Sequence, residues 1–375
     1  MSRLAPLPAT RSQSRVHERR HDLDALRAFA MLAGVALHAA IAFVPYSATE
    51  GEAFAWGFFE FIHGFRMPIF FMLSGYFTAM LWRSRGLRGL LSHRIRRIGI
   101  PFVVGVFTIV PLVRLSYVAA DGLVDGAGSH VPAAITLSHL WFLWFLVWMI
   151  AGFAVAAAAI DAATSAGWFQ KLLSSPKLVL LGLVALPLLT IVPSTRMADD
   201  VFGADFSDTF IPNDGVLAFY TGFFVFGALL FGRATASGDE FIDVLGRWWG
   251  LQLLVGSLVL FPLGQWLMQD NWNASAVVQV AFAWTMSFGL LGLFRTVLNR
   301  QRAWVSWLSD ASYWMYLVHL PLVIVGQGAA SSLGLAPIVA FPAIFALTTV
   351  LLLISYQYAV RYSPIGTMLN GARTR

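Results

Sequence analysis

The first long apolar run of the chain begins with DALRAFAMLAGVALH, residues 24 to 38, and continues to residue 46. A run of this length and hydropathy predicts a helix inside a membrane. Beyond Asp24 it holds two ionisable residues, Arg27 and His38. Arg27 and His38 are eleven residues apart. Eleven helical steps of about 100° bring their side chains to within about 20° of the same helix face, about 16 Å apart along the axis. Ionisable side chains are costly in hydrocarbon and are usually functional there, so this face is a candidate site.

The composition of the whole chain agrees with this interpretation. Of its 375 residues, 58% are hydrophobic and 12% are charged, whereas soluble domains have about 45–50% apolar and about 25% charged residues. The charges are gathered between long apolar runs. We therefore predict an all-α, polytopic membrane bundle, and membrane topology explains the net charge of +6 better than nucleic-acid binding does.

The apolar runs predict about ten transmembrane helices, since about 20 apolar residues cross the hydrocarbon core. The second run is long enough to tilt or to break near Pro68, and the fifth is short and contains Pro187 and Pro193. The predicted spans are 25–46, 55–82, 98–118, 138–160, 177–194, 215–232, 249–268, 276–297, 309–329 and 336–360.

The loop charges predict the orientation. Loops on the side of the N-terminus are rich in arginine, and the opposite loops are mainly acidic, with Arg196 as an exception. By the positive-inside rule both termini are cytoplasmic, which agrees with an even number of spans. We expect a disordered basic cytoplasmic tail at 1–20, one transmembrane domain at 21–362 and a short cytoplasmic tail at 363–375. The N-terminal apolar run is too long for a signal peptide and is interpreted as a retained helix.

The chain lacks the usual nucleophile and metal signatures. It contains no cysteine, which excludes a cysteine nucleophile and a disulfide. It has no Gly-x-Ser-x-Gly elbow, Walker loop, His-Glu-x-x-His metal motif or dinucleotide-binding glycine motif. We predict no metal, and a covalent intermediate is not favoured. A histidine that acts as general base on a hydroxyl is the simplest mechanism.

A second polar group lies in the second predicted span. Glu60, His63 and Arg66 follow one another at three-residue intervals, so His63 is next to both on the helix surface. Such residues need a partner or a wet cavity. The alternative is that Glu60 and Arg66 neutralise one another and only fix helix packing. Further along, Ser74 and Gly75 are small enough for close helix approach.

The loop after this span is dense in basic residues, namely Arg83, Arg85, Arg88, His93, Arg94, Arg96 and Arg97. Positive-inside bias and attraction to anionic lipid account for about half of them. Arg94 and Arg97, one turn apart, are positioned to present two guanidinium groups to phosphates, as a nucleotide-like donor such as coenzyme A requires.

Three further residues are candidates for lining a substrate pocket together with Glu60. His139 precedes the fourth span, His319 lies inside the ninth, and Arg114 lies near the outer end of the third. A lone histidine at an interface more often packs than reacts. For Arg114 the alternative is a side chain that snorkels to the membrane surface.

Taken in order, these motifs resemble the acyltransferase-3 family of integral membrane acyltransferases over residues 20 to 360. The most specific are Arg27-x10-His38 and Arg94-x-x-Arg97. Three further stretches, FIHGFRM at 61–67, FFMLSGYF at 70–77 and SHLWFL at 138–143, are most similar to the glucans biosynthesis protein C branch, associated with glucan succinylation.

The resemblance implies the following roles. Acyl-CoA, as co-substrate and not as a permanently bound cofactor, would dock at the cytoplasmic face on Arg94 and Arg97. Its acyl group would be succinyl, or less favourably acetyl. His38 would be the general base for a hydroxyl of a periplasmic glucan or another extracytoplasmic carbohydrate. Arg27 would hold the donor or orient neighbours, and His63 and Arg66 would steady the oxyanion or position the acceptor.

The resemblance further implies a multi-pass protein of the bacterial inner membrane, in contact with lipids and not with nucleic acid. Three alternatives remain. The first is a transporter or flippase of a polar or glycan substrate, which would move it without acyl-CoA. The second is another membrane O-acyltransferase, including the unrelated MBOAT class, which product mass would distinguish. The third is a scaffold without catalysis, which would need no buried histidine.

Overall fold

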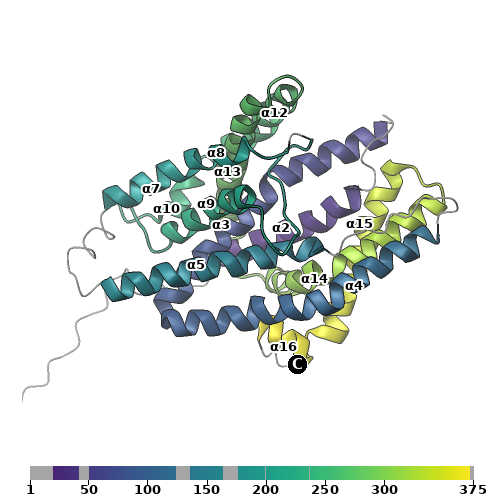
Figure 1. Cartoon of the computed structure of the whole chain (residues 1–375), viewed down its shortest axis with the longest axis horizontal. Coiled ribbons are helices and arrows are strands. Elements are labelled where there is room, and N and C mark those ends of the chain that lie inside the picture. Colours follow the sequence, from purple (N-terminus) through teal and green to yellow (C-terminus); the bar gives the residue numbers. More distant parts are fainter. Residues whose placement is uncertain are drawn as a thin grey trace, which may run out of the picture.

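The computed structural model describes residues 20–41, 50–123, 136–163, 176–198, 200–235 and 237–371. These residues form helices and no named strand (Figure 1). The first half contains α2 (His21–Ala40), α3 (Glu50–Arg94), η2 (Ile95–Gly99), α4 (Ile100–Asp121), η3 (Ser138–Leu140), α5 (Trp141–Ala163), α7 (Pro176–Leu189), α8 (Ile191–Ser194) and α9 (Asp214–Leu230). The second half contains α10 (Phe241–Leu245), α11 (Trp249–Val255), η4 (Gly256–Leu260), α12 (Phe261–Met268), α13 (Trp272–Val297), α14 (Ala303–Ser332), α15 (Pro337–Ser355), η5 (Tyr356–Val360) and α16 (Pro364–Asn370).

Seven helical stretches of the described residues are long and apolar enough to cross a membrane. One of them, Gly51–Asp121, is continuous over the second and third predicted spans, and two shorter apolar helices, Leu178–Ser194 and Asp214–Leu230, occupy the fifth and sixth. The predicted all-helical membrane bundle is therefore confirmed. The count of ten and the cytoplasmic position of both termini stay predictions. The predictions for 1–19, 42–46 and 372–375 fall outside the described residues.

The long helix α3 differs from the prediction in where it is interrupted. Helical geometry continues through Pro68, and the non-helical residue is Gly86, with φ 66° and ψ 179°. A membrane helix tolerates proline when neighbouring groups satisfy the freed carbonyl. A positive φ is open to glycine without steric cost, so the chain changes direction at Gly86.

Helices α3 and α9 are in backbone contact. A Cβ atom on Gly75 would lie 1.8 Å from the carbonyl oxygen of Phe224, and one on Gly227 would lie 1.8 Å from that of Met72. Each glycine thus faces the backbone of the other helix. Small residues permit this approach in membranes, where packing replaces the hydrophobic effect between helices.

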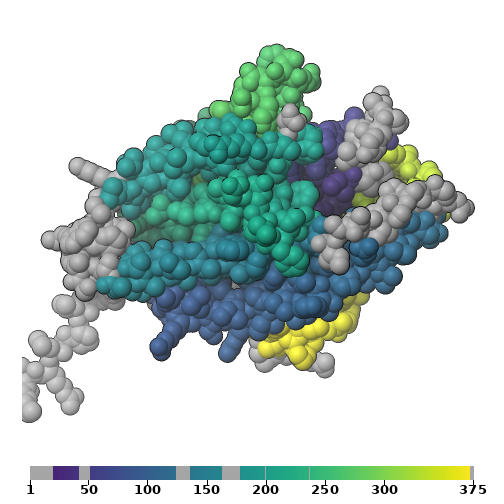
Figure 2. Space-filling model, viewed as in Figure 1, coloured from purple at the N-terminus to yellow at the C-terminus, as the bar shows by residue number. Residues whose placement is uncertain are grey.

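Helix α2 lies in the interior and contacts α3, α13, α14 and α15. Most of its residues are buried. In Figure 2 the outer surface of this view is formed largely by α4, α5 and α7, while α12 projects from the body. The polar residues of α2 therefore face other helices, as expected for a functional helix.

The last described helix, α16, is docked on the bundle. Helix α16 contacts η2 and α14. Its Leu369 is buried, and the side-chain amide of Asn370 donates a hydrogen bond to the carbonyl of Asp310 (2.7 Å). The segment expected to be a short tail thus contains a packed helix.

Candidate active site

Three histidines from distant parts of the sequence form an imidazole cluster, defined as His38, His139 and His319. The ring centres of His38 on α2 and His319 on α14 are 5.0 Å apart. The ring centres of His319 and His139, in η3, are also 5.0 Å apart. The cluster therefore joins the predicted base to two residues that were predicted only to line a pocket.

Hydrogen bonds fix the tautomers of two of these rings. Nδ1 of His319 lies 2.8 Å from the carbonyl oxygen of Tyr316 and 3.1 Å from that of Met315. Nε2 of His139 lies 3.2 Å from the carbonyl oxygen of Leu317. Since carbonyls only accept, these nitrogens carry the hydrogens. The opposite nitrogens, Nε2 of His319 and Nδ1 of His139, are buried without a hydrogen-bond partner.

The position of His139 is held from both sides. Ser138, just before it, has φ 49°, a left-handed conformation that is uncommon outside glycine. The hydroxyl of Tyr316 donates a hydrogen bond to the carbonyl of His139 (2.7 Å). The short helix η3 is therefore tied directly to α14.

Arg66 places an uncompensated cation beside the cluster. A Cβ atom on Gly34, one turn before His38, would lie 2.2 Å from Nη1 of Arg66, so the guanidinium rests on α2. Its charge acts on His38 and His319. Its Nε is buried without a partner. No ion pair or hydrogen bond of Arg66 is found among the described residues, so the alternative of a Glu60–Arg66 pair is not observed.

Glu60 and His63 bind a loop instead. The carboxylate of Glu60 accepts hydrogen bonds from the backbone N–H of Phe202 (3.0 Å) and from the amide of Gln265 (2.5 Å). Nδ1 of His63 donates to the carbonyl of Phe202 (3.0 Å). Gly203 has φ 115°, and a Cβ there would lie 2.6 Å from Nδ1 of His63. Glycine is therefore required, and these two side chains hold the loop in place.

The same loop is anchored by its other neighbours. The ring of Phe202 is fully buried and contacts the rings of Phe261 and Phe282. The amide oxygen of Gln279 accepts a hydrogen bond from the backbone N–H of Gly203 (2.7 Å). The hydroxyl of Tyr220 donates hydrogen bonds to the backbone carbonyls of Ala204 (3.1 Å) and Asp205 (3.0 Å). Sequence analysis missed this loop because backbone groups do the bonding.

A large cavity lies at the other end of α2. Its volume is about 1450 Å³, and it is lined by α2, α3, α13 and the segment between α9 and α11. Carboxylates at its wall are Asp24, Asp239, Glu240 and Asp243. Arginines outnumber them and comprise Arg20, Arg27, Arg85, Arg94, Arg233, Arg247 and Arg295. Burial, followed by repulsion from Arg83, lowers the pKa of Arg233. The cavity is therefore suited to an anionic ligand.

The two arginines predicted to bind phosphates together point to different places. Arg94 lines the cavity and donates to Thr78 Oγ1 (2.7 Å). Arg97 is not among the lining residues, and its guanidinium donates to the carbonyl of Leu369 in α16. The cause is the π-helical turn η2, Ile95–Gly99, because wider turns rotate residues three apart off a common face. Arg27, in contrast, lies in the cavity wall, over the ring of Phe77 at 5.9 Å.

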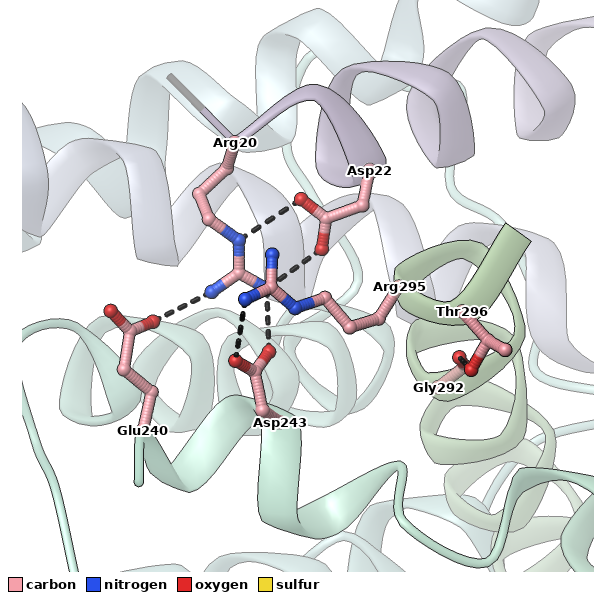
Figure 3. A network of polar contacts seen from close by, with 7 residues as sticks. All are labelled: Arg20, Asp22, Glu240, Asp243, Gly292, Arg295 and Thr296. Atoms are coloured by element: carbon pink, nitrogen blue, oxygen red, sulfur yellow. Dashed lines mark hydrogen bonds and ion pairs between the residues drawn. The ribbon is translucent and has the colours of Figure 1, made fainter. Parts of the chain in front are cut away.

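An ion-pair network at the rim of this cavity was not predicted (Figure 3). Arg20 donates to Asp22 (3.0 and 2.7 Å), Glu240 (2.6 Å) and Asp243 (2.7 Å). Arg295 pairs with the other oxygen of Asp243 at 3.3 Å. Burial by itself lowers the pKa of Arg20. The hydrogen bond to Asp22 and the negative charges of Asp22 and Asp243 outweigh burial, and the pKa is raised. The network ties the start of α2 to α10 and α13.

Arg114 belongs to neither feature. It is exposed on α4 and is not among the residues that line the cavity. Within the described ranges, no group of three or more histidine, aspartate or glutamate side chains is arranged to hold a metal ion. The cluster itself offers three imidazoles, with the guanidinium of Arg66 beside it.

Comparison with known proteins covers most of the chain. A family model described as an acyltransferase domain matches residues 20–357. Proteins named glucans biosynthesis protein C from Salmonella paratyphi B, Salmonella dublin and Salmonella typhi are each 29% identical over 332 residues, which is 82% of this chain and 83% of the relative. No solved structure matches.

Proposed function

Because the chain belongs to the acyltransferase-3 family, we propose that it moves an acyl group from cytoplasmic acyl-CoA to a hydroxyl of an extracytoplasmic carbohydrate. The observation that carries this proposal is the arrangement along α2. One end of this buried helix meets an arginine-rich cavity through Arg27, and the other end presents His38 to two more imidazoles and to Arg66.

The cavity is the proposed donor site. Coenzyme A carries phosphates, and arginine is well suited to bind them through paired N–H groups. Because Arg97 is engaged with α16, we assign the phosphates to Arg94 together with Arg85 and Arg247 in the same wall. The cavity exceeds the roughly 300–1,000 Å³ of common ligand sites, as a bulky cofactor requires.

The imidazole cluster is the proposed site of transfer. His38 takes the proton of the acceptor hydroxyl as that oxygen attacks the thioester carbonyl carbon. The new carbon–oxygen bond replaces the carbon–sulfur bond, and the proton passes from His38 to the leaving thiolate. Arg66 stabilises the oxyanion that forms in between, which is worth more in a dry site than in water.

The acyl group and the acceptor follow from charge and from the relatives. The guanidinium of Arg66 is half-buried and its Nε has no hydrogen-bond partner, which favours an acyl group that ends in a carboxylate, so we propose succinyl, with acetyl as the alternative. The relatives are named for glucan biosynthesis, so we propose a periplasmic glucan as acceptor. The protein would then lie in the bacterial inner membrane with both termini in the cytoplasm.

The test uses membranes that carry the full chain, supplied with labelled succinyl-CoA or acetyl-CoA and a glucan. His38→Gln should lower turnover by about 100-fold or more, since general base catalysis contributes 10²–10⁴. His21→Gln, on the same helix but outside cluster and cavity, is the matched control. Wild-type turnover in His38→Gln would refute the base. Substrate movement across the membrane without acyl-CoA would instead indicate a transporter.

A further inference from the structure

His319 holds a buried hydrogen-bond acceptor with no partner. Its Nδ1–H is engaged with the carbonyls of Met315 and Tyr316, in its own helix. Nε2, on the opposite side of the ring, is therefore a bare lone pair, and it is buried without a partner. Leaving such an atom unsatisfied destabilises the fold, so a functional use is expected.

The ring of His38 is within reach of this lone pair. A hydrogen bond spans about 3 Å and each ring nitrogen lies about 1 Å from its ring centre, so bonded imidazoles have centres about 5 Å apart. The observed separation is 5.0 Å, with the rings tilted by 46°. The ring of His38 itself forms no hydrogen bond within the described part of the chain. The separation is therefore short enough for an N–H of His38 to reach Nε2 of His319.

The backbone keeps the two residues opposed. The side-chain amide of Gln327 on α14 donates a hydrogen bond to the backbone carbonyl of His38 (2.8 Å). This bond crosses from α14 to α2 at the level of the base. It fixes the register of the two helices through the backbone of His38 and leaves its ring nitrogens unoccupied by Gln327.

The electrostatics of the site create a need for such a partner. The guanidinium of Arg66 rests on α2 at Gly34, one turn before His38, so a positive charge lies beside the base. Catalytic histidines are commonly supported by a carboxylate that orients the ring and stabilises the imidazolium. None of the ion pairs among the described residues involves His38, His139 or His319. A neutral acceptor with a fixed tautomer is what the structure offers in place of a carboxylate.

We propose that His319 is a positioning residue for His38: its bare Nε2 accepts a hydrogen bond from the imidazole of His38 and so orients the base. This rests on the proposed function, in which His38 takes the hydroxyl proton. One nitrogen of His38 receives that proton and later gives it to the thiolate. The other nitrogen keeps its hydrogen and donates it to His319, which retains its own Nδ1–H throughout.

The experiment compares two amide replacements in the full-length protein in membranes. In His319→Asn the short amide can still donate to the helix carbonyls but offers no acceptor at the place of Nε2. In His319→Gln the longer side chain carries a carbonyl oxygen to that place. His21→Asn is the matched control, because His21 lies outside the cluster and the cavity.

We expect His319→Asn to lower kcat by about 10-fold or more with little change in the KM for acyl-CoA, and His319→Gln to restore most of the loss. Thermal unfolding of each purified variant shows that it is folded. Provided that the wild type transfers the acyl group, equal losses of kcat in both variants, or an unchanged kcat in His319→Asn, would overturn the assignment. If the wild type shows no acyl-CoA-dependent transfer, the proposed function fails, and this assignment fails with it.

Discussion

Replacing Gly34 by alanine is expected to separate activity from stability. The new Cβ would lie 2.2 Å from Nη1 of Arg66, whereas non-bonded heavy atoms settle about 3.5 Å apart, so the guanidinium must withdraw by about 1.3 Å. Because the clash is with the end of a flexible side chain, the helices need not move. Alanine also favours a helix over glycine by up to about 1 kcal/mol.

The expected result is a large loss of turnover in a protein that is as stable as the wild type or more so. A displacement of about 1 Å in a positioned group can cost about 100-fold in rate, and Arg66 is the proposed oxyanion partner. We would measure kcat for acyl transfer in membranes and the Tm of the purified protein in detergent.

Gly152→Ala is the matched control for Gly34→Ala. A Cβ on Gly152 would have no neighbour within 4 Å, and this glycine lies on α5, away from the cluster. It should leave kcat unchanged and share the gain in Tm that alanine brings to a helix, so the two variants should differ only in turnover. If Gly34→Ala kept kcat within about threefold of the wild type, the position of Arg66 would not matter to the reaction and the reasoning would be wrong.

Three further predictions concern other parts of the bundle. Gly75→Ala would put a Cβ 1.8 Å from a backbone oxygen, which cannot move as a flexible side chain can. Thermal unfolding should therefore show a loss of stability of about 1–3 kcal/mol or more, and an unchanged Tm would contradict the contact. Arg94→Gln should raise the KM for acyl-CoA by about 10-fold, whereas Arg97→Gln should mainly lower Tm, and the reverse pattern would refute the donor site. Burial raises the pKa of Asp205, so the folded state binds the proton more tightly and stability falls as pH rises through that pKa. Asp205→Asn should therefore raise Tm more at pH 7 than at pH 4. Equal shifts of Tm at the two pH values would contradict the raised pKa of Asp205.

The fold was largely predictable because hydrophobicity along the chain carries the information. Apolar runs separated by charged loops leave few options other than a membrane bundle. The Arg27–His38 pair was visible for the same reason, since ionisable residues stand out in such a run. The break in α3 was misplaced because glycine and proline both interrupt helices, and only the structure shows that Gly86 has the left-handed backbone.

The site was less predictable because it depends on how the helices are rotated. Nothing in the sequence indicates that His319 faces both His38 and His139, since residues more than a hundred positions apart are brought together only by packing. The divergence of Arg94 and Arg97 follows from one π-helical turn, which hydrophobic periodicity does not reveal.

The contact between α3 and α9 limits how this protein can move. Helices that slide past one another need side chains at their interface that change rotamer, but here Gly75 and Gly227 set backbone against backbone. Neither helix can translate or roll without a collision, so the pair behaves as a rigid frame. Any cycle that admits substrates from the two sides of the membrane must therefore be carried by the elements around this frame.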